Sequence, residues 1–157
     1  MLRRNMAHKP KPTILIIDDE ESIRTLLQIS LSHRGFEVLT AENGEKGIEI
    51  FKTRNPPIVL TDIKMPGIDG IEVLRKIRAL DAEAEVIVIT GHGDMASAIE
   101  ALKLEASDFI TKPIKDDILM HAINRAKETR WIKQKLKEYT SHLEQKVWEA
   151  TKELKKA

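Results

Sequence analysis

Short apolar runs alternate with stretches of helical spacing along the first four-fifths of the chain. Five runs rich in β-branched residues are predicted as strands. They are Thr13–Ile17, Phe36–Thr40, Ile58–Thr61, Glu85–Thr90 and Asp108–Thr111. Between them, apolar residues recur three or four positions apart, as at Ile71, Leu74 and Ile77, which is typical of amphipathic helices. This alternation predicts an α/β fold, with helices covering both faces of a parallel sheet.

The composition of each run indicates its place in the sheet. Ile14–Ile17 and Val86–Ile89 are apolar at successive positions, as a strand buried on both faces requires, so we expect them in the middle. The run at 36–40 contains Glu37 and suits an edge. Pro56-Pro57 ends the second helix and leads into the third strand.

The C-terminal segment has a different pattern. From Asp116 onward there is neither Gly nor Pro, so one helix can run nearly to the end. Its apolar residues step by four or three positions, which is the stripe of a coiled coil with one stutter. They are Ile132, Leu136, Tyr139, Leu143, Val147, Ala150 and Leu154. A lone helix with this stripe is marginally stable, so we expect residues 126–157 to pair in a homodimer. A helix folded back onto the domain, or frayed, is the alternative.

Charge is unevenly distributed along the chain, although the formal net charge is only +1. Residues 13–114 hold 11 Lys/Arg and 18 Asp/Glu, a net charge of −7, whereas residues 115–157 hold 11 and 7, a net charge of +4. Residues 1–12 supply the remaining +4 and are predicted to be a disordered tail. Because the C-terminal basic residues alternate with Glu and no helix-turn-helix break occurs, we expect no direct binding of nucleic acid.

Length and composition limit the classes of protein. At 157 residues, the chain suits one domain, which we place at residues 13–125, with a helical appendage. The absence of cysteine excludes disulfides and thiolate metal ligands. The run Ile14–Ile17 is far too short for a signal peptide or a membrane span. We therefore expect a cytoplasmic protein without membrane contact.

Polar residues stand at the ends of four predicted strands. Asp18 and Asp19 follow the first run, and Asp62 follows the third. Thr90 ends the fourth run, and Lys112 follows the fifth. Because the carboxyl ends of parallel strands lie at one edge of a sheet, these side chains are expected to meet in one crevice. Taken alone, any of them could be a loop charge, and Asp19 could simply cap the following helix.

The chemistry of these residues predicts a metal and a phosphoryl group. Three neighbouring carboxylates repel one another unless a cation compensates them. Oxygen ligands without His or Cys favour Mg²⁺, with Mn²⁺ as the alternative, and such ions usually also bind a phosphate oxygen. Lys112 can pair with that phosphate and the Thr90 hydroxyl can donate to it. Asp62, alone at the end of a central strand, is the candidate nucleophile that forms an aspartyl phosphate.

Four motifs carry a resemblance to a known family. They are Ile-Ile-Asp-Asp-Glu at 16–20, Thr-Asp-Ile-Lys-Met-Pro-Gly-Ile-Asp-Gly at 61–70, Ile-Thr-Gly-His-Gly at 89–93 and Asp-Phe-Ile-Thr-Lys-Pro at 108–113. Residues 13–125 thereby resemble the receiver domain of two-component response regulators. This implies a flavodoxin-like, doubly wound sheet of order 2-1-3-4-5. It also implies Mg²⁺-dependent phosphorylation of Asp62 by a histidine kinase or histidine phosphotransfer protein.

The resemblance further implies the metal ligands. Asp19, Asp62 and the backbone carbonyl of Lys64 correspond to the direct ligands of Mg²⁺ in the family. Asp18 corresponds to a residue that acts through water.

Switch residues are implied in the same way. Thr90 and Lys112 match the family's phosphate-sensing pair. Phe109 falls at its aromatic switch position, where an ordinary core ring is the alternative reading. The peptide bond between Lys112 and Pro113 matches the family's usual cis bond.

These features together favour a signalling switch over an enzyme with turnover. Phosphorylation is expected to switch the surface formed by the fourth helix, the fifth strand and the fifth helix. The output is expected to pass through the C-terminal helix, with a downstream effector domain as a further partner. A phosphatase of the haloacid-dehalogenase type also forms an aspartyl phosphate, but that class uses an Asp-x-Asp arrangement, whereas Asp18 and Asp19 are adjacent. A degenerate receiver that only scaffolds a dimer usually lacks the acceptor or the acidic pair. His142 faintly resembles a kinase phospho-acceptor but lacks the acidic residue and proline that follow it there, so we expect a surface histidine.

Overall fold

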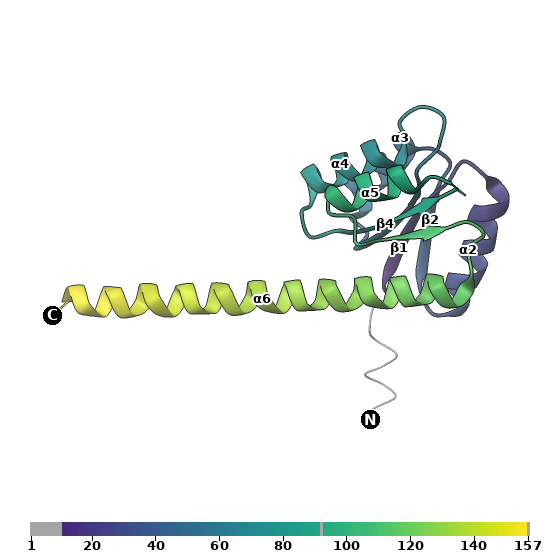
Figure 1. Ribbon diagram of the computed structural model, residues 1–157. Helices are drawn as coiled ribbons and strands as arrows, with labels where there is room; N and C mark the ends of the chain where they lie inside the picture. The colour runs from purple at the N-terminus through teal and green to yellow at the C-terminus, as the bar shows by residue number, and fades with distance from the viewer. Residues whose placement is uncertain (1–10, 92, 157) are drawn as a thin grey trace, which may run out of the picture.

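The computed structural model describes residues 11–91 and 93–156 and shows a parallel sheet flanked by helices (Figure 1). The strands are β1 (Thr13–Ile17), β2 (Glu37–Ala41), β3 (Ile58–Asp62), β4 (Glu85–Thr90) and β5 (Asp108–Thr111). The helices are α2 (Glu21–His33), α3 (Gly44–Arg54), α4 (Gly70–Leu80), α5 (Met95–Lys103) and α6 (Asp116–Lys156). Residues 1–10 of the predicted tail lie outside the described residues.

The strand order is β2-β1-β3-β4-β5, and all neighbours are parallel. The predicted doubly wound, flavodoxin-like sheet is therefore confirmed. The apolar runs of β1 and β4 lie inside the sheet, and β2 lies at its edge, as their compositions predict. The second strand begins at Glu37 instead of Phe36, because the Phe36 amide donates to the Leu31 carbonyl at the end of α2, whereas the Glu37 amide donates to the Pro12 carbonyl.

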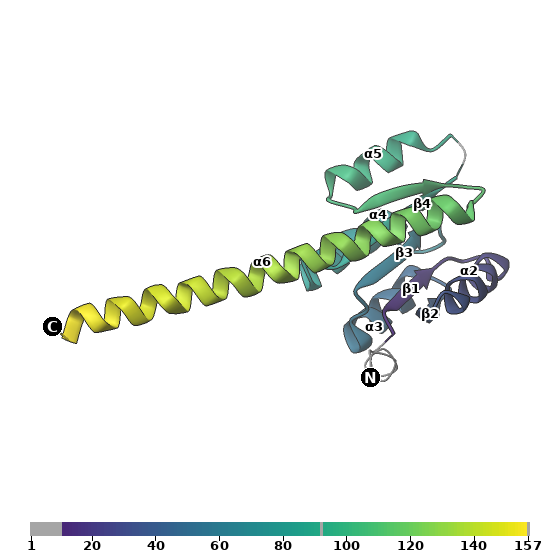
Figure 2. The ribbon, with the colours of Figure 1, turned by 90° about the horizontal axis from the view of Figure 1, so that it is seen from below.

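Two cores lie on opposite faces of the sheet. Successive residues of a strand point to opposite faces, so Leu15 packs in one core and Ile14 in the other. The first core is closed by α3, α4 and α5, and the second by α2 and the beginning of α6 (Figures 1 and 2). Each helix is held by its apolar face, for example Phe51 of α3 and Leu31 of α2. This packing leaves the carboxyl ends of the strands free to carry polar groups.

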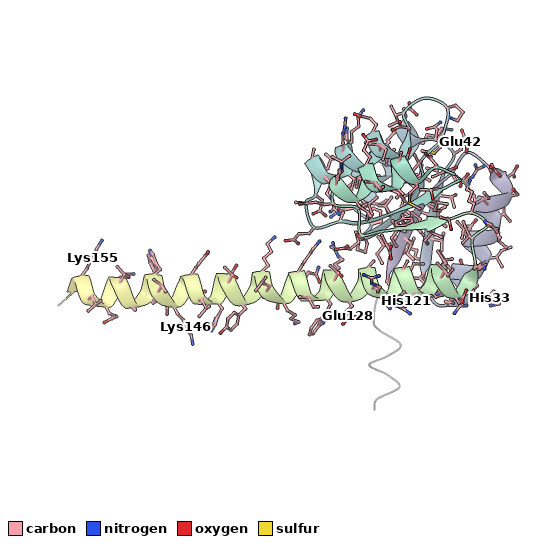
Figure 3. The ribbon with its side chains drawn as sticks, in the orientation of Figure 1. His33, Glu42, His121, Glu128, Lys146 and Lys155 are labelled. Atoms are coloured by element: carbon pink, nitrogen blue, oxygen red, sulfur yellow. The ribbon has the colours of Figure 1, made fainter. Side chains whose placement is uncertain are left out.

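Helix α6 is a single helix of 41 residues. Its first turns pack on the sheet through Leu119, Ala122, Ile123 and Ala126. The helix then continues far beyond the domain without folding back (Figures 1 and 2). Lys146 and Lys155 stand on this projecting part (Figure 3). Among the described residues, no helix is long and apolar enough to cross a membrane.

Candidate metal centre

Three carboxylates meet where β1 and β3 end. The two strands are neighbours with Ile17 opposite Thr61, so the residues that follow them are brought together. Oxygen atoms of Asp18, Asp19 and Asp62 all lie within 4.8 Å of one another. Asp18 is fully buried, Asp62 is almost so, and Asp19 is exposed. The arrangement is a small acidic site with one open side.

Two hydrogen bonds hold Asp18 in the loop after β1. The Glu20 amide donates to Oδ1 of Asp18 at 2.9 Å, and the Arg24 guanidinium donates to the Asp18 carbonyl at 2.8 Å. Oδ2 of Asp18 is buried and has no hydrogen-bond partner. An unpartnered buried carboxylate oxygen is costly, and a cation or its bound water would satisfy it. The donor set therefore fits a hard divalent cation.

Lys112 reaches into the site from the end of β5. Its ammonium nitrogen lies 3.0 Å from Oδ2 of Asp62, 3.8 Å from Oδ2 of Asp18 and 3.8 Å from Oε1 of Glu20. Its backbone amide bonds the Thr90 carbonyl at 2.8 Å, and the bond to the following proline is cis, as expected. The structure thus brings Lys112 to the carboxylates, and it adds Glu20, which the sequence had not singled out.

The other predicted residues lie on β4, on β5 and in the loop after β3. Thr90 ends β4, beside β3, and is buried; its hydroxyl points to the Ile110 carbonyl, 3.5 Å away. Phe109 is half-buried and packs on the core closed by α3, α4 and α5. The Lys64 side chain is largely exposed and lies 3.9 Å from Asp94. Thr90 therefore follows Ile89, the register partner of Asp62, and its hydroxyl bonds Ile110.

Gly70 was missed at the sequence level. A Cβ at this position would lie 2.3 Å from the Asp62 carbonyl oxygen, so the first turn of α4 approaches the end of β3 as only glycine permits. The Gly70 amide also donates to the Ile63 carbonyl at 2.8 Å, and Asp69 caps the helix by accepting from the Glu72 amide. A glycine after an N-capping Asp was the available signal.

Burial disfavours the charged forms of the carboxylates. The pKa of Asp18 is raised to about 6, mainly by burial. The negative charges of Asp62 and Asp19 also raise it, whereas the hydrogen bond from the Glu20 amide and the positive charge of Lys112 lower it. Burial also raises the pKa of Asp62, although Lys112 opposes it. Burial alone would lower the pKa of Lys112, but its bond to Asp62 and the nearby carboxylates raise it. Without a cation, ionisation of this site is costly.

This cost predicts a pH-dependent effect of Mg²⁺ on stability. The pKa of Asp18 rises from 3.8 to about 6 on folding. The contribution of Asp18 to the free energy of unfolding is therefore fully present below pH 3.8 and is lost as the pH rises through 6. The loss amounts to about 3 kcal/mol at about 1.4 kcal/mol per pKa unit. Mg²⁺ binds the ionised form, so it should stabilise the protein more at pH 7.5 than at pH 5. Urea unfolding with and without Mg²⁺ measures this difference.

The Asp18→Asn variant is the control for this prediction. It removes the titrating group and should reduce the dependence of unfolding free energy on pH between 4 and 7. A wild type whose stabilisation by Mg²⁺ is the same at both pH values would contradict the electrostatic account.

Comparison with known proteins identifies the class. The family described as "Response regulator receiver domain" matches residues 14–124. The chain therefore belongs to the receiver domain family of response regulators, whose members are phosphorylation-dependent signalling switches. Chemotaxis protein CheY of Bacillus subtilis (strain 168) is 40% identical over 121 residues, 76% of this chain and 98% of that protein. Transcriptional regulatory protein FixJ of Rhizobium meliloti (strain 1021) is 40% identical over 116 residues, 74% of this chain and 57% of that protein.

Solved structures agree with this assignment. A response regulator receiver domain protein from Clostridium thermocellum has a TM-score of 0.74 at 38% identity, over 76% of this chain and 97% of that one. NtrX from Brucella abortus, in complex with ADP, has a TM-score of 0.79 at 35% identity, over 83% of this chain and 30% of that one. Several relatives are much longer than the match; the chain spans only 25% of the regulatory protein DctD of Pseudomonas aeruginosa.

Proposed function

We propose that this receiver domain accepts a phosphoryl group on Asp62 in a Mg²⁺-dependent reaction and works as a switch. The observation that supports this most directly is the cluster of Asp18, Asp19 and Asp62 oxygens within 4.8 Å, with Lys112 at 3.0 Å from Asp62. Few protein ligands, one open side and an adjacent ammonium group suit a metal that shares a phosphoryl group.

Asp19, Asp62 and the Lys64 carbonyl are the proposed direct ligands of Mg²⁺, and Asp18 acts through water. Oδ2 of Asp18 is buried without a hydrogen-bond partner, and a metal-bound water would supply one. When bound, Mg²⁺ (or Mn²⁺) neutralises the carboxylates and the transferred phosphoryl group. That neutralisation reverses the effect of burial, which otherwise holds the Asp18 pKa at about 6.

The transfer itself needs little covalent chemistry from the protein. A carboxylate oxygen of Asp62 attacks the phosphorus of a phosphohistidine, the new O–P bond forms as the P–N bond breaks, and the electron pair leaves with the histidine nitrogen. Lys112 pairs with the phosphoryl oxygens. The Thr90 hydroxyl then leaves the Ile110 carbonyl, a long contact of 3.5 Å, and donates to the phosphoryl group. Phe109 moves into the space beside Thr90.

The partners follow from this chemistry. The phosphoryl donor is a histidine kinase or a histidine phosphotransfer protein. Residues 13–125 form the receiver, and residues 126–157 form the extension that pairs with a second copy and relays the change to a downstream effector. The chain catalyses only its own phosphorylation and dephosphorylation, in the cytoplasm, without contact with membrane or nucleic acid.

A small phosphodonor tests the proposal without the cognate kinase. Acetyl phosphate or phosphoramidate with Mg²⁺ should add one phosphoryl group per chain, seen by intact-protein mass spectrometry. Chelation of the metal with EDTA should prevent the addition. An unchanged mass of the wild type with both donors would refute the proposal.

A further inference from the structure

A partly buried ion pair lies at the end of the sheet opposite the metal centre, with the Lys133 side chain 39% exposed and its carboxylate partner buried. Glu85 begins β4 and is only 1% exposed. Its carboxylate is 2.9 Å from the ammonium group of Lys133 on α6, and it also accepts a hydrogen bond from the Ser107 hydroxyl. A buried carboxylate that loses its partner is strongly destabilising. The position of Lys133, and with it that turn of α6, is therefore strongly specified.

Other basic residues of α6 bind the same rim of the domain. Arg130 donates to the Glu83 carbonyl at 3.2 Å, and Lys137 lies 3.5 Å from the Glu83 carboxylate. Nearer the start of α6, Arg125 lies 3.6 Å from Asp108 of β5. These three contacts are at least partly exposed and individually weak. At 100° per residue, Arg130 and Lys137 lie within roughly 60° of Lys133 around the helix, so both favour the same rotation of α6 about its axis, whereas Arg125 lies roughly 80° away on the other flank.

This rotation leaves the apolar stripe uncovered. At 100° per residue, the stripe that starts at Ile132 and Leu136 is centred roughly 100° around the helix from Lys133 and Lys137. Leu136 is 63% exposed and Leu143 is 45% exposed. The stripe thus starts on the turns that are fastened to the domain, but it lies on the exposed flank of α6 and not on the face that packs against the domain.

A second copy of the chain is the occupant that fits the stripe. From Ile132 to Leu154 the stripe runs about 33 Å along the helix at 1.5 Å per residue. That length and the spacing of its residues are those of a coiled-coil seam of about three heptads. No other described segment covers it, because the domain lies on another side of α6.

Strand β4 connects this junction to the metal centre. It has Glu85 at its amino end and Thr90 at its carboxyl end, and all six of its residues are buried. It is hydrogen-bonded to β3, which ends in Asp62, and to β5. A displacement of Thr90 toward a phosphoryl group acts on a strand whose other end binds Lys133 of α6.

We propose that Glu85 and Lys133 form a clamp that fixes the rotation of α6, presents its stripe to a second copy, and couples that interface to phosphorylation through β4. The inference rests on the proposed function in two respects, the phosphorylation of Asp62 and the pairing of α6. The clamp is a positioning device and takes no part in phosphoryl transfer.

Lys133→Met and Glu85→Gln test the clamp, and Lys135→Met is the matched control. Lys135 lies two residues from Lys133 and pairs at 3.4 Å with Glu138 of the same helix, so its loss leaves the junction intact. In the unphosphorylated protein, hydrogen exchange of amides 127–137 should be about tenfold faster or more in both clamp variants, since local opening of the helix becomes easier. The control should exchange as the wild type does.

Sedimentation with Mg²⁺, with and without phosphoramidate, tests the coupling. Phosphorylation should change the dimer dissociation constant of the wild type and the control by at least about tenfold, and that of the clamp variants by less than about twofold. Phosphoryl incorporation should be the same in all four proteins. This measurement distinguishes a loss of coupling between phosphorylation and dimerisation from a loss of phosphorylation itself.

Clamp variants that exchange and respond like Lys135→Met would overturn the inference. A wild type that takes up no phosphoryl group, or that is monomeric, would instead refute the proposed function. In that case the exchange rates of the unphosphorylated proteins still decide whether Glu85 and Lys133 hold α6.

Discussion

Replacement of Asp62 by asparagine is expected to lower phosphoryl incorporation from acetyl phosphate by at least about a thousandfold, because the covalent route itself is lost. An amide oxygen is a poor nucleophile toward phosphorus, and Asn also removes one charge from the metal centre. Intact-protein mass spectrometry at equal Mg²⁺ concentration measures the loss.

Asp69→Asn provides the control for this result. Asp69 lies in the loop after β3 and caps α4, a role that Asn fills equally well. The same chemical change there should leave incorporation unaltered. Full labelling of Asp62→Asn would show that another residue accepts the phosphoryl group.

Removal of residues 138–157 is expected to convert a dimer into a monomer. The deletion takes away most of the stripe, from Tyr139 onward, but keeps Lys133 and Lys137 on the domain, so Glu85 remains paired. Burial of one leucine contributes about 1.5–3 kcal/mol. Since about 1.4 kcal/mol is a factor of ten, the dissociation constant should rise at least about a hundredfold, as sedimentation equilibrium would measure.

Two point variants separate the stripe from the helix as a whole. Leu143→Asp places a charge within the stripe and should dissociate the dimer. Gln145→Asp places the same charge on the opposite side of α6, roughly 160° away at 100° per residue, and should not. Equal sedimentation of the two variants and the wild type would contradict pairing through the stripe.

The sequence predicts the sheet well because the sheet depends on local patterns. Continuous apolar runs in β1 and β4 require burial on both faces, and the charged β2 requires an edge. The carboxyl ends of parallel strands then place Asp18, Asp62 and Lys112 together without further information. The one-residue shift of β2 arises because the Phe36 amide bonds the Leu31 carbonyl at the end of α2, a contact that the β propensity of Phe36 does not indicate.

Contacts between side chains of separate elements were not predictable in this way. Lys133 and Glu85 lie 48 positions apart, and each is an ordinary charged residue in its own segment. Their pairing depends on the direction in which α6 leaves the sheet, which no periodicity encodes. For the same reason, the sequence did not single out the bond from Arg24 to the Asp18 carbonyl or the approach of Glu20 to Lys112.

The identity of the phosphorylated atom is the most direct test of the central claim. Borohydride reduction of the phosphorylated wild type converts an aspartyl phosphate to homoserine, which peptide mass spectrometry locates. We predict homoserine at position 62 alone, formed only when Mg²⁺ was present during phosphorylation. Homoserine at another position, or none in a protein that carries the phosphoryl group, would contradict the account.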